Sequence, residues 1–385
     1  MKFEFATATR ILFGAGTLDQ IGAGAKHFGR RALLVTGRNA SRAEKLLVDL
    51  QANGVGTATF AVPGEPELAT VEQGIKLAKT EQCDLVIGFG GGSVLDAAKT
   101  VAVMLANEGE LLDYVEIIGR GKTLARPSAP FIAIPTTAGT GSEVTRNAVL
   151  ASPEHKLKVS LRSPLMLARV AVVDTELTYD LPPALTATTG LDALTQLIEP
   201  YVCSRANPMT DGLCVEGIRR VARSLRVAFR DGQNKSARED MAVASLFGGL
   251  ALANAGLGAV HGFAGPIGGM FSNAPHGAVC AALLPQVMNA NLQALEQRAP
   301  DSEALRRYET VARLLTGEAR ATTGMGVEWM RELAADLQIP PLRTYGIQAR
   351  HVADIVAKAT NASSMKANPI ALTPEELAET LRLAL

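Results

Sequence analysis

The stretch 85-LVIGFGGGSVLDAAK-99 combines three local patterns that together decide the fold. Residues 85–87 form a short apolar run that is typical of a strand buried on both faces. Gly90, Gly91 and Gly92 let the backbone turn sharply and approach a ligand without a Cβ in the way. Ser93 is a natural N-cap for the apolar-faced helix that follows. We therefore expect a strand, a glycine turn and a helix whose first N–H groups attract an anion.

The same glycine turn also has a purely structural explanation, because a tight turn that feeds a packed helix uses the same residues. The pattern departs from the usual GxGxxG, since Ser93 occupies the last glycine position and no acidic residue follows at the customary distance. A binding role for the turn therefore depends on other parts of the chain.

The part of the chain before about residue 180 repeats a strand and then a helix. Short β-rich runs occupy residues 32–36, 58–62, 85–89, 131–134 and 170–174. Amphipathic stretches at residues 43–52 and 71–80 lie between them. This alternation predicts an open parallel sheet covered by helices, and we assign residues 1–181 to an α/β domain built on that sheet.

The character of the sequence changes after Leu181-Pro182-Pro183. Strand patterns fade, and residues 191–202 and 212–229 have helical periodicity. We therefore expect residues 182–385 to form an all-helical domain. A length of 385 residues is consistent with roughly two domains, each with a full core.

Composition excludes several functional classes. The net charge is zero, so a nucleic-acid partner is not expected. The four cysteines show no CxxC spacing, which favours a reduced protein. The first 16 residues include Glu4 and Arg10 and lack a continuous apolar run, so they do not resemble a signal peptide. We expect a cytoplasmic location.

A charge-free segment covers residues 241–295, which include no Asp, Glu, Lys or Arg. Such a segment has to be largely buried. A membrane span is the alternative, but Gly, Pro, Asn and Ser interrupt the segment, and no purely apolar run of about 18 residues survives. We interpret the segment as the core of the helical domain and expect no membrane contact.

Two histidines, His261 and His276, lie inside this charge-free segment. A buried imidazole needs hydrogen-bond partners or a metal, because unpaired polar atoms cost on the order of 1–3 kcal/mol. Asp192 and Gln196 lie one turn apart on the predicted helix 191–202. A carboxylate with two imidazoles is a common catalytic metal set. The alternatives are two hydrogen-bonded core histidines and an aspartate that caps its helix.

Cys280, near His276, is interpreted as a core thiol, since no charged neighbour in the sequence would lower its pKa.

The motifs 135-PTTAGTGSEVT-145 and 90-GGGSVLDAAK-99 together resemble those of the iron-containing (group III) alcohol dehydrogenase family. The resemblance extends to Gly190-Leu191-Asp192-Ala193-Leu194, His261-Gly262, Pro275-His276-Gly277 and Asn368-Pro369, and so covers nearly the whole chain. It implies an α/β dinucleotide-binding domain followed by an all-helical domain, as in dehydroquinate synthase, with nicotinamide cofactor and metal in the cleft between them. A homodimer is also expected from the family.

The resemblance also implies a set of cofactor-binding residues. The pyrophosphate would lie on the glycine turn, the ribose and nicotinamide near three threonines, and Lys158 would contact the cofactor. The expected set is Gly37, Arg38, Asn39, Gly90, Gly91, Gly92, Ser93, Asp96, Thr136, Thr137, Thr140, Ser142 and Lys158.

Cofactor choice depends on the loop after the first β-rich run. Many NAD-preferring relatives carry an aspartate where Gly37 stands, and that carboxylate would repel a 2′-phosphate. Here the repulsion is missing, and Arg38 and Arg42 offer positive charge. We therefore favour NADP over NAD.

The metal ligands implied by the family are one aspartate and three histidines. Asp192, His261 and His276 match, whereas Gln196 stands at the second position, and Gly265 stands where a further histidine is usual near the nicotinamide. A neutral amide is a weaker ligand than imidazole for Fe2+ or Zn2+. We expect these four residues, with Gln196 included, to hold a divalent metal more weakly than in relatives.

The resulting hypothesis is an oxidoreductase that moves a hydride between NAD(P)(H) and an alcohol, aldehyde or ketone, with Asp192, His261 and His276 as its catalytic residues. One alternative is metal-independent reduction of an oxo-acid, as in maleylacetate reductase. Another is a non-catalytic dinucleotide-binding protein. A lyase or cyclase of the dehydroquinate synthase type would need a Lys and Arg cluster for a phosphorylated substrate, and the helical part shows none.

Overall fold

The computed structural model describes residues 2–385, and the chain divides into two compact units. Residues 6–137 and 141–178 form the first, which we call the α/β unit. The second, the helical unit, comprises residues 2–5, the segment Ala138–Thr140 and everything from Tyr179 onward.

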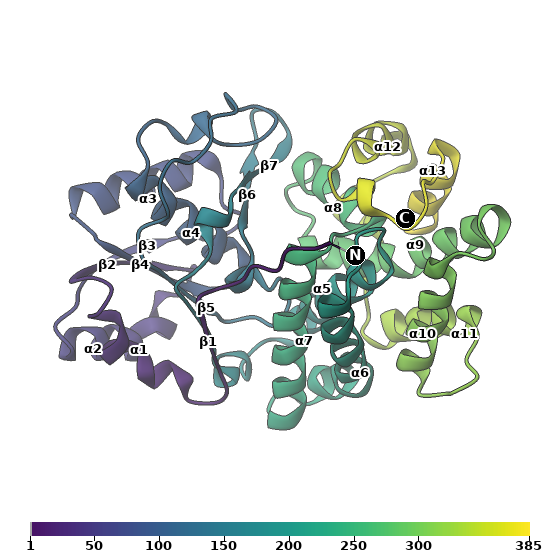
Figure 1. The fold of residues 1–385 in the computed structure, drawn as a ribbon, viewed down its shortest axis with the longest axis horizontal. Coiled ribbons are helices and arrows are strands. Elements are labelled where there is room, and N and C mark those ends of the chain that lie inside the picture. Colours follow the sequence, from purple (N-terminus) through teal and green to yellow (C-terminus); the bar gives the residue numbers. More distant parts are fainter. Residues whose placement is uncertain (1) are drawn as a thin grey trace. The chain divides into compact units, whose positions relative to one another are not determined.

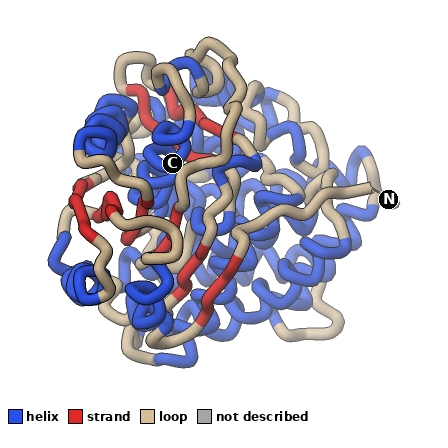
Figure 2. The backbone as a smooth tube through the Cα atoms, turned by 60° about the vertical axis from the view of Figure 1, so that its left-hand side comes forward, coloured by secondary structure: helices blue, strands red, loops and turns tan. Residues whose placement is uncertain are grey.

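The α/β unit is built on a six-stranded sheet with the order β1-β8-β5-β4-β2-β3, and every neighbouring pair is parallel. The strands are β1 (Arg10–Phe13), β2 (Arg31–Thr36), β3 (Gly56–Ala61), β4 (Leu85–Gly90), β5 (Phe131–Pro135) and β8 (Val170–Val173). In Figure 2 these strands are red and lie among helices drawn in blue. The open parallel sheet predicted from the sequence is confirmed.

Helices cover both faces of this sheet. They are α1 (Ile21–Ala25), α2 (Glu44–Ala52), α3 (Leu68–Thr80) and α4 (Gly92–Ala106). Figure 1 shows α1 and α2 on one side and α3 and α4 on the other. The packing of α4 requires Gly88, because a Cβ there would lie 2.9 Å from the Ala98 side chain.

Three strands were missed by the sequence analysis: β1 and the antiparallel pair β6 (Asn147–Ser152) and β7 (Leu157–Arg162). The edge strand β1 has only four residues. In β6, buried and half-buried residues alternate, as expected of a ribbon with one covered face. Such a pattern has no long apolar run that could mark it as a strand.

The start of α4 corrects one prediction. Ser93 does not cap the helix: the N-cap is Gly91, no side chain makes a capping hydrogen bond, and the helix begins at Gly92. The turn before the helix is tight, because a Cβ on Gly90 would lie 2.6 Å from the Val94 side chain. The first turn of α4 is therefore free of the side-chain cap that would otherwise compete with an anion.

The helical unit contains α5 (Pro183–Val202), α6 (Pro208–Arg230), α7 (Lys235–Asn254), α8 (Ala259–Met270), α9 (His276–Arg298), α10 (Glu303–Thr316), α11 (Thr323–Asp336), α12 (Val352–Thr360) and α13 (Pro374–Leu383). Helix α5 packs against α6, α7 and α9, and leucines at 191, 194 and 197 are completely buried. The predicted helices 191–202 and 212–229 are confirmed as parts of α5 and α6.

The charge-free segment lies in α7, α8 and the first part of α9, and it contributes Phe263, Val279 and Leu284 to the core. Its predicted burial is confirmed. Among the described residues, no single helix is both long and apolar enough to cross a membrane. Helices α7 and α8 reach that threshold only as a pair, with a bend of 94° between them.

Candidate functional site

One face of α5 carries three buried polar side chains: Asp192, Gln196 and Glu199, with exposed fractions of 2%, 3% and 5%. Their spacing of four and then three residues places them along the same side of the helix. The helix begins at Pro183, eight residues before the predicted start, because Pro182 and Pro183 suit its N-terminus. Asp192 is therefore in the helix interior, and the interpretation that it caps the helix is wrong.

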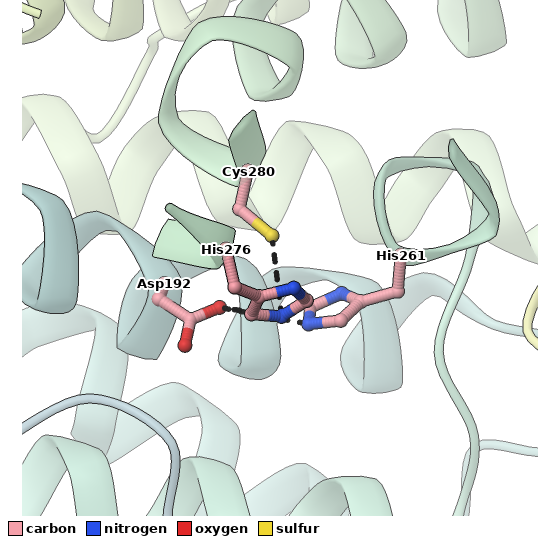
Figure 3. Close-up of side chains that lie close together, drawn as sticks. All are labelled: Asp192, His261, His276 and Cys280. Atoms are coloured by element: carbon pink, nitrogen blue, oxygen red, sulfur yellow. Dashed lines mark hydrogen bonds and ion pairs between the residues drawn. The ribbon is translucent and has the colours of Figure 1, made fainter. Parts of the chain in front are cut away.

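His261 and His276 meet Asp192 from two other helices (Figure 3). His261 is in the first turn of α8, and its Nε2 lies 3.6 Å from Asp192 Oδ1. His276 is the first residue of α9, and its Nε2 lies 3.7 Å from the same oxygen. The start of α9 comes this close to α5 because residue 277 is glycine: a Cβ there would lie 2.7 Å from the Thr188 carbonyl oxygen.

Cys280 is a fourth member of this cluster. It follows His276 by one turn of α9, is fully buried, and its Sγ lies 3.7 Å from His276 Nε2. Asp192, His261, His276 and Cys280 each offer one ligand atom, and these four atoms lie within 4.8 Å of one another. We name this group the 192/261/276/280 cluster. The sequence predicted Cys280 to be a core thiol; its burial is confirmed, but its place beside the histidines was not predicted, although its spacing of four residues from His276 would have indicated it.

The oxygens of α5 show that this cluster suits a divalent cation. Asp192 Oδ1 and Gln196 Oε1 are both buried and have no hydrogen-bond partner. An unpaired buried oxygen is costly, and a carboxylate more so, whereas coordination to a cation satisfies both. The donor set of carboxylate, imidazoles and thiol is one that transition metals and zinc bind. The residues therefore fit the metal expected from the sequence.

Glu199 holds His261 in place. Its Oε2 lies 2.6 Å from His261 Nδ1, and its Oε1 accepts a hydrogen bond of 2.7 Å from the Val260 N–H. Burial lowers the pKa of His261, but the charges of Glu199 and Asp192 and the hydrogen bond to Glu199 outweigh burial and raise the pKa to about 10. With Nδ1–H donating to Glu199, Nε2 is directed at the cluster, where a metal can replace the proton.

Asn368 supports the same end of α8 from the distant C-terminal segment. Its Oδ1 accepts a hydrogen bond of 3.0 Å from the Ala259 N–H, and its Nδ2 donates to Asn291 Oδ1 at 2.7 Å. Together, Glu199 and Asn368 satisfy two N–H groups of the first turn of α8, which carries His261. The motif Asn368-Pro369 thereby gains a structural role.

We predict that Glu199→Gln lowers metal affinity about 10- to 100-fold, as is usual when the carboxylate behind a ligating histidine is lost. The amide keeps an oxygen for the Val260 N–H, so the fold should persist. Competition with a chromophoric chelator measures the effect. Glu216→Gln, which removes a half-exposed carboxylate paired with Arg220, is the control and should leave affinity unchanged. Equal affinities for the two variants would contradict the prediction.

The predicted cofactor residues of the α/β unit follow the carboxyl ends of neighbouring strands. Gly37 follows β2, the glycine turn follows β4, and Thr136 follows β5 and donates its N–H to the Gly90 carbonyl at 2.9 Å. Strand β2 pairs with β3 on one side and with β4 on the other, so the strand order changes direction between β2 and β4. Open α/β sheets bind ligands at such a point. Thr137 is close to Gly91, with its side chain 3.4 Å from the position of a Cβ there.

Other predicted cofactor residues have partners within the fold. Asp96 accepts hydrogen bonds from Ser142 Oγ at 2.6 Å and from the Val149 N–H at 2.9 Å. Lys158, on β7, forms an ion pair of 3.0 Å with Glu65. Asn39 accepts a hydrogen bond of 3.2 Å from the Ser41 N–H. Thr140 lies in the short segment that groups with the helical unit.

Lys99 carries a fully buried ammonium group whose role was not predicted from the sequence. Its Nζ donates to the carbonyls of Ser142 and Asn147 at 2.9 and 2.7 Å, and to Thr145 Oγ1 at 3.0 Å. Asp96 Oδ1 lies 3.7 Å away. Burial lowers the pKa of Lys99 and raises that of Asp96. The ammonium group ties the residues after the threonine motif to α4.

Glu143 makes stability depend on pH. It is 2% exposed, and burial raises its pKa to about 7, above the 4.5 of an ordinary glutamate. Between these values the folded chain binds a proton that the unfolded chain does not, so stability falls as pH rises from 4.5 to 7, by about 3 kcal/mol in total. Glu143→Gln should flatten this dependence, measured as the urea midpoint at a series of pH values. Parallel curves for variant and wild type would contradict it.

Comparison with known proteins gives a consistent result over the whole chain. Residues 8–175 match the family model described as "Iron-containing alcohol dehydrogenase", and residues 186–385 match the one described as "Fe-containing alcohol dehydrogenase family, C-terminal". The 1,3-propanediol dehydrogenase of Citrobacter freundii is 35% identical, over 99% of this chain and 98% of the relative. Alcohol dehydrogenase 4 of Saccharomyces cerevisiae (strain ATCC 204508 / S288c) is 34% identical, over 97% and 96%.

A solved structure has the same fold. The crystal structure of a 1,3-propanediol oxidoreductase superposes with a TM-score of 0.92 and 34% sequence identity, covering 100% of both chains. The likeness therefore extends to both units of the chain.

Proposed function

The chain belongs to the iron-containing alcohol dehydrogenase family, and we propose that it is a metal-assisted oxidoreductase acting on small neutral aldehydes and their alcohols. It transfers a hydride between a nicotinamide cofactor and an alcohol or aldehyde, as its relatives named alcohol dehydrogenase and 1,3-propanediol dehydrogenase do. The observation that carries the proposal is a pair of buried oxygens without hydrogen-bond partners: Asp192 Oδ1, in the 192/261/276/280 cluster, and Gln196 Oε1, one turn further along α5.

Each unit contributes its own binding residues. Asp192, His261 and His276 would hold a divalent cation, which polarises the substrate oxygen when bound, while the nicotinamide ring supplies or accepts the hydride. Glu199 keeps His261 Nε2 directed at the cluster through its contact with Nδ1. In the α/β unit, the first turn of α4 offers backbone N–H groups to the pyrophosphate, and the glycines before it admit the approach.

The substrate class follows from charge. The segment that carries both histidines contains no lysine or arginine, so its side chains offer a carboxylate substrate no cationic partner. A small neutral carbonyl needs no such partner. The test compares kcat/KM for propanal and for a short 2-oxo acid, in protein that is metal-loaded and in protein treated with chelator. If only the oxo acid is turned over, and the chelator does not change its kcat/KM, the proposal is wrong and the result supports metal-independent reduction of an oxo acid. Cofactor binding with no turnover would support a non-catalytic protein.

We further propose NADP(H) as the preferred form of the cofactor. Gly37 offers no carboxylate to repel a 2′-phosphate. Exposed Arg38 follows it in the loop, and exposed Arg42 lies in the short 3-10 helix Ala40–Ala43 that comes next. Arg38 donates to the Pro63 carbonyl and Arg42 to the Leu177 carbonyl. Gly37→Asp should lower the ratio of kcat/KM for NADPH to that for NADH about tenfold or more. An unchanged ratio would contradict the preference.

Assembly and location complete the proposal. A homodimer is proposed from the family, and a cytoplasmic location is supported by four buried cysteines that form no disulfide within the described chain.

A further inference from the structure

The sulfur of Cys280 points into the 192/261/276/280 cluster (Figure 3). Cys280 is completely buried, at the position on α9 one turn after His276, so helix geometry places both side chains on one face. The other cysteines of the helical unit, Cys203 and Cys214, are also buried but belong to no such cluster among the described residues.

The separations match those of atoms that share one metal ion. A tetrahedral zinc ion with Zn–S of about 2.3 Å and Zn–N of about 2.0 Å holds its sulfur and nitrogen ligands roughly 3.5 Å apart. Cys280 Sγ and His276 Nε2 are 3.7 Å apart, and Asp192 Oδ1 lies 3.6 and 3.7 Å from the two imidazole nitrogens. The other pairs among the four ligand atoms lie within 4.8 Å, which gathers all four around one position.

A second, independent observation points to a ligand at this place. Asp192 Oδ1 and Gln196 Oε1 are buried and lack hydrogen-bond partners, so α5 presents two oxygens that coordination to a cation would satisfy. Gln196 is a neutral amide, the weakest donor of the group for zinc or iron. The thiol is the stronger candidate for the fourth place.

We propose that Cys280 Sγ, as a thiolate, is the fourth ligand of the metal beside Asp192, His261 and His276, and that it makes zinc preferred over ferrous iron. This inference rests on the proposed metal-assisted function. On binding, the S–H bond breaks, the sulfur–metal bond forms, and the proton leaves to solvent. A thiolate is a soft ligand and therefore favours Zn2+ over Fe2+. Zn2+ also binds a given site of nitrogen, oxygen and sulfur ligands more tightly than Fe2+ does.

Cobalt(II) provides a direct test that does not depend on activity. The chelator-treated protein is loaded with one equivalent of cobalt(II), and the near-ultraviolet thiolate-to-cobalt charge-transfer band is recorded together with bound cobalt. We expect the band in wild type and in the matched control Cys214→Ser, a buried cysteine outside the cluster. In Cys280→Ser and Cys280→Ala the band should disappear, and zinc affinity should fall at least about tenfold, with less effect on affinity for ferrous iron.

Each result decides between distinct conclusions. Bound cobalt without the band in wild type, or a band that persists in Cys280→Ser, would overturn the thiolate ligand while leaving the metal-assisted function intact. Failure of wild type to bind cobalt or zinc would overturn both. If the Cys280 variants do not fold, X-ray absorption at the zinc edge of wild type decides: sulfur at about 2.3 Å supports the inference, and a shell of nitrogen and oxygen alone overturns it.

Discussion

Replacing Asp192 with asparagine should strip the metal from the protein and lower kcat about a thousandfold or more. Asp192 Oδ1 is the oxygen shared by both imidazoles, at 3.6 Å from His261 and 3.7 Å from His276, and the residue is 2% exposed. The amide removes the only carboxylate of the cluster and keeps its size. Lewis-acid polarisation of the substrate oxygen is worth several kcal/mol, and each 1.36 kcal/mol is about a factor of ten in rate.

Metal content by mass spectrometry and kcat with a saturating aldehyde check this result. The control is Asp240→Asn, which alters a buried carboxylate of the same unit that Arg220, Arg223 and Ser224 bind. That variant should lose stability but retain metal and kcat in the folded fraction. Stoichiometric metal in Asp192→Asn, or an equal loss of metal in Asp240→Asn, would contradict the assignment of Asp192.

Replacing Lys99 with methionine should destabilise the α/β unit by about 3–5 kcal/mol, as expected when one partner of a buried charge pair is removed. The variant leaves Asp96 uncompensated, and it leaves the carbonyls of Ser142 and Asn147 without the ammonium donor. Residues 142–147 should then loosen, and nicotinamide cofactor affinity should fall with stability, because this segment follows the threonine motif.

The shift in the urea midpoint and the dissociation constant for NADPH measure both effects. Lys76→Met removes an exposed lysine of α3 and should change neither. The double variant Lys99→Met with Asp96→Asn should regain part of the lost stability, since no buried charge is left unpaired. A midpoint within error of wild type for Lys99→Met would show that the buried ammonium group is not needed.

Much of the site was predictable from local sequence patterns. His261 and His276 were expected because buried imidazoles need partners, and Asp192 and Gln196 because helical spacing and the family resemblance placed them as further ligands. The structure brings Asp192, His261 and His276 together. Glu199 was missed, although it stands seven residues after Asp192 on the same helical face. Carboxylates at helical spacing are too common to single out one that lies behind a histidine.

Cys280 shows why sequence neighbours mislead about buried side chains. Its neighbours in sequence are apolar, which predicts an inert thiol, but the residues that surround its sulfur come from α5 and α8 as well as α9. The helix that contains Asp192 was likewise predicted too short, since residues 183–190 were not recognised as its start. Because α5 begins at Pro183, Asp192 lies in its interior and cannot cap it.

By itself, the sequence determined the order of strand, glycine turn and helix around residues 85–99, the parallel sheet and the helical second part. Apolar periodicity and glycine act over a few residues, so they can be read locally. Only the tertiary structure decided which groups share one site: His261 and Glu199 are 62 residues apart, yet 2.6 Å separates Nδ1 from Oε2. Such contacts depend on how α5, α8 and α9 pack, and the packing results from the whole core.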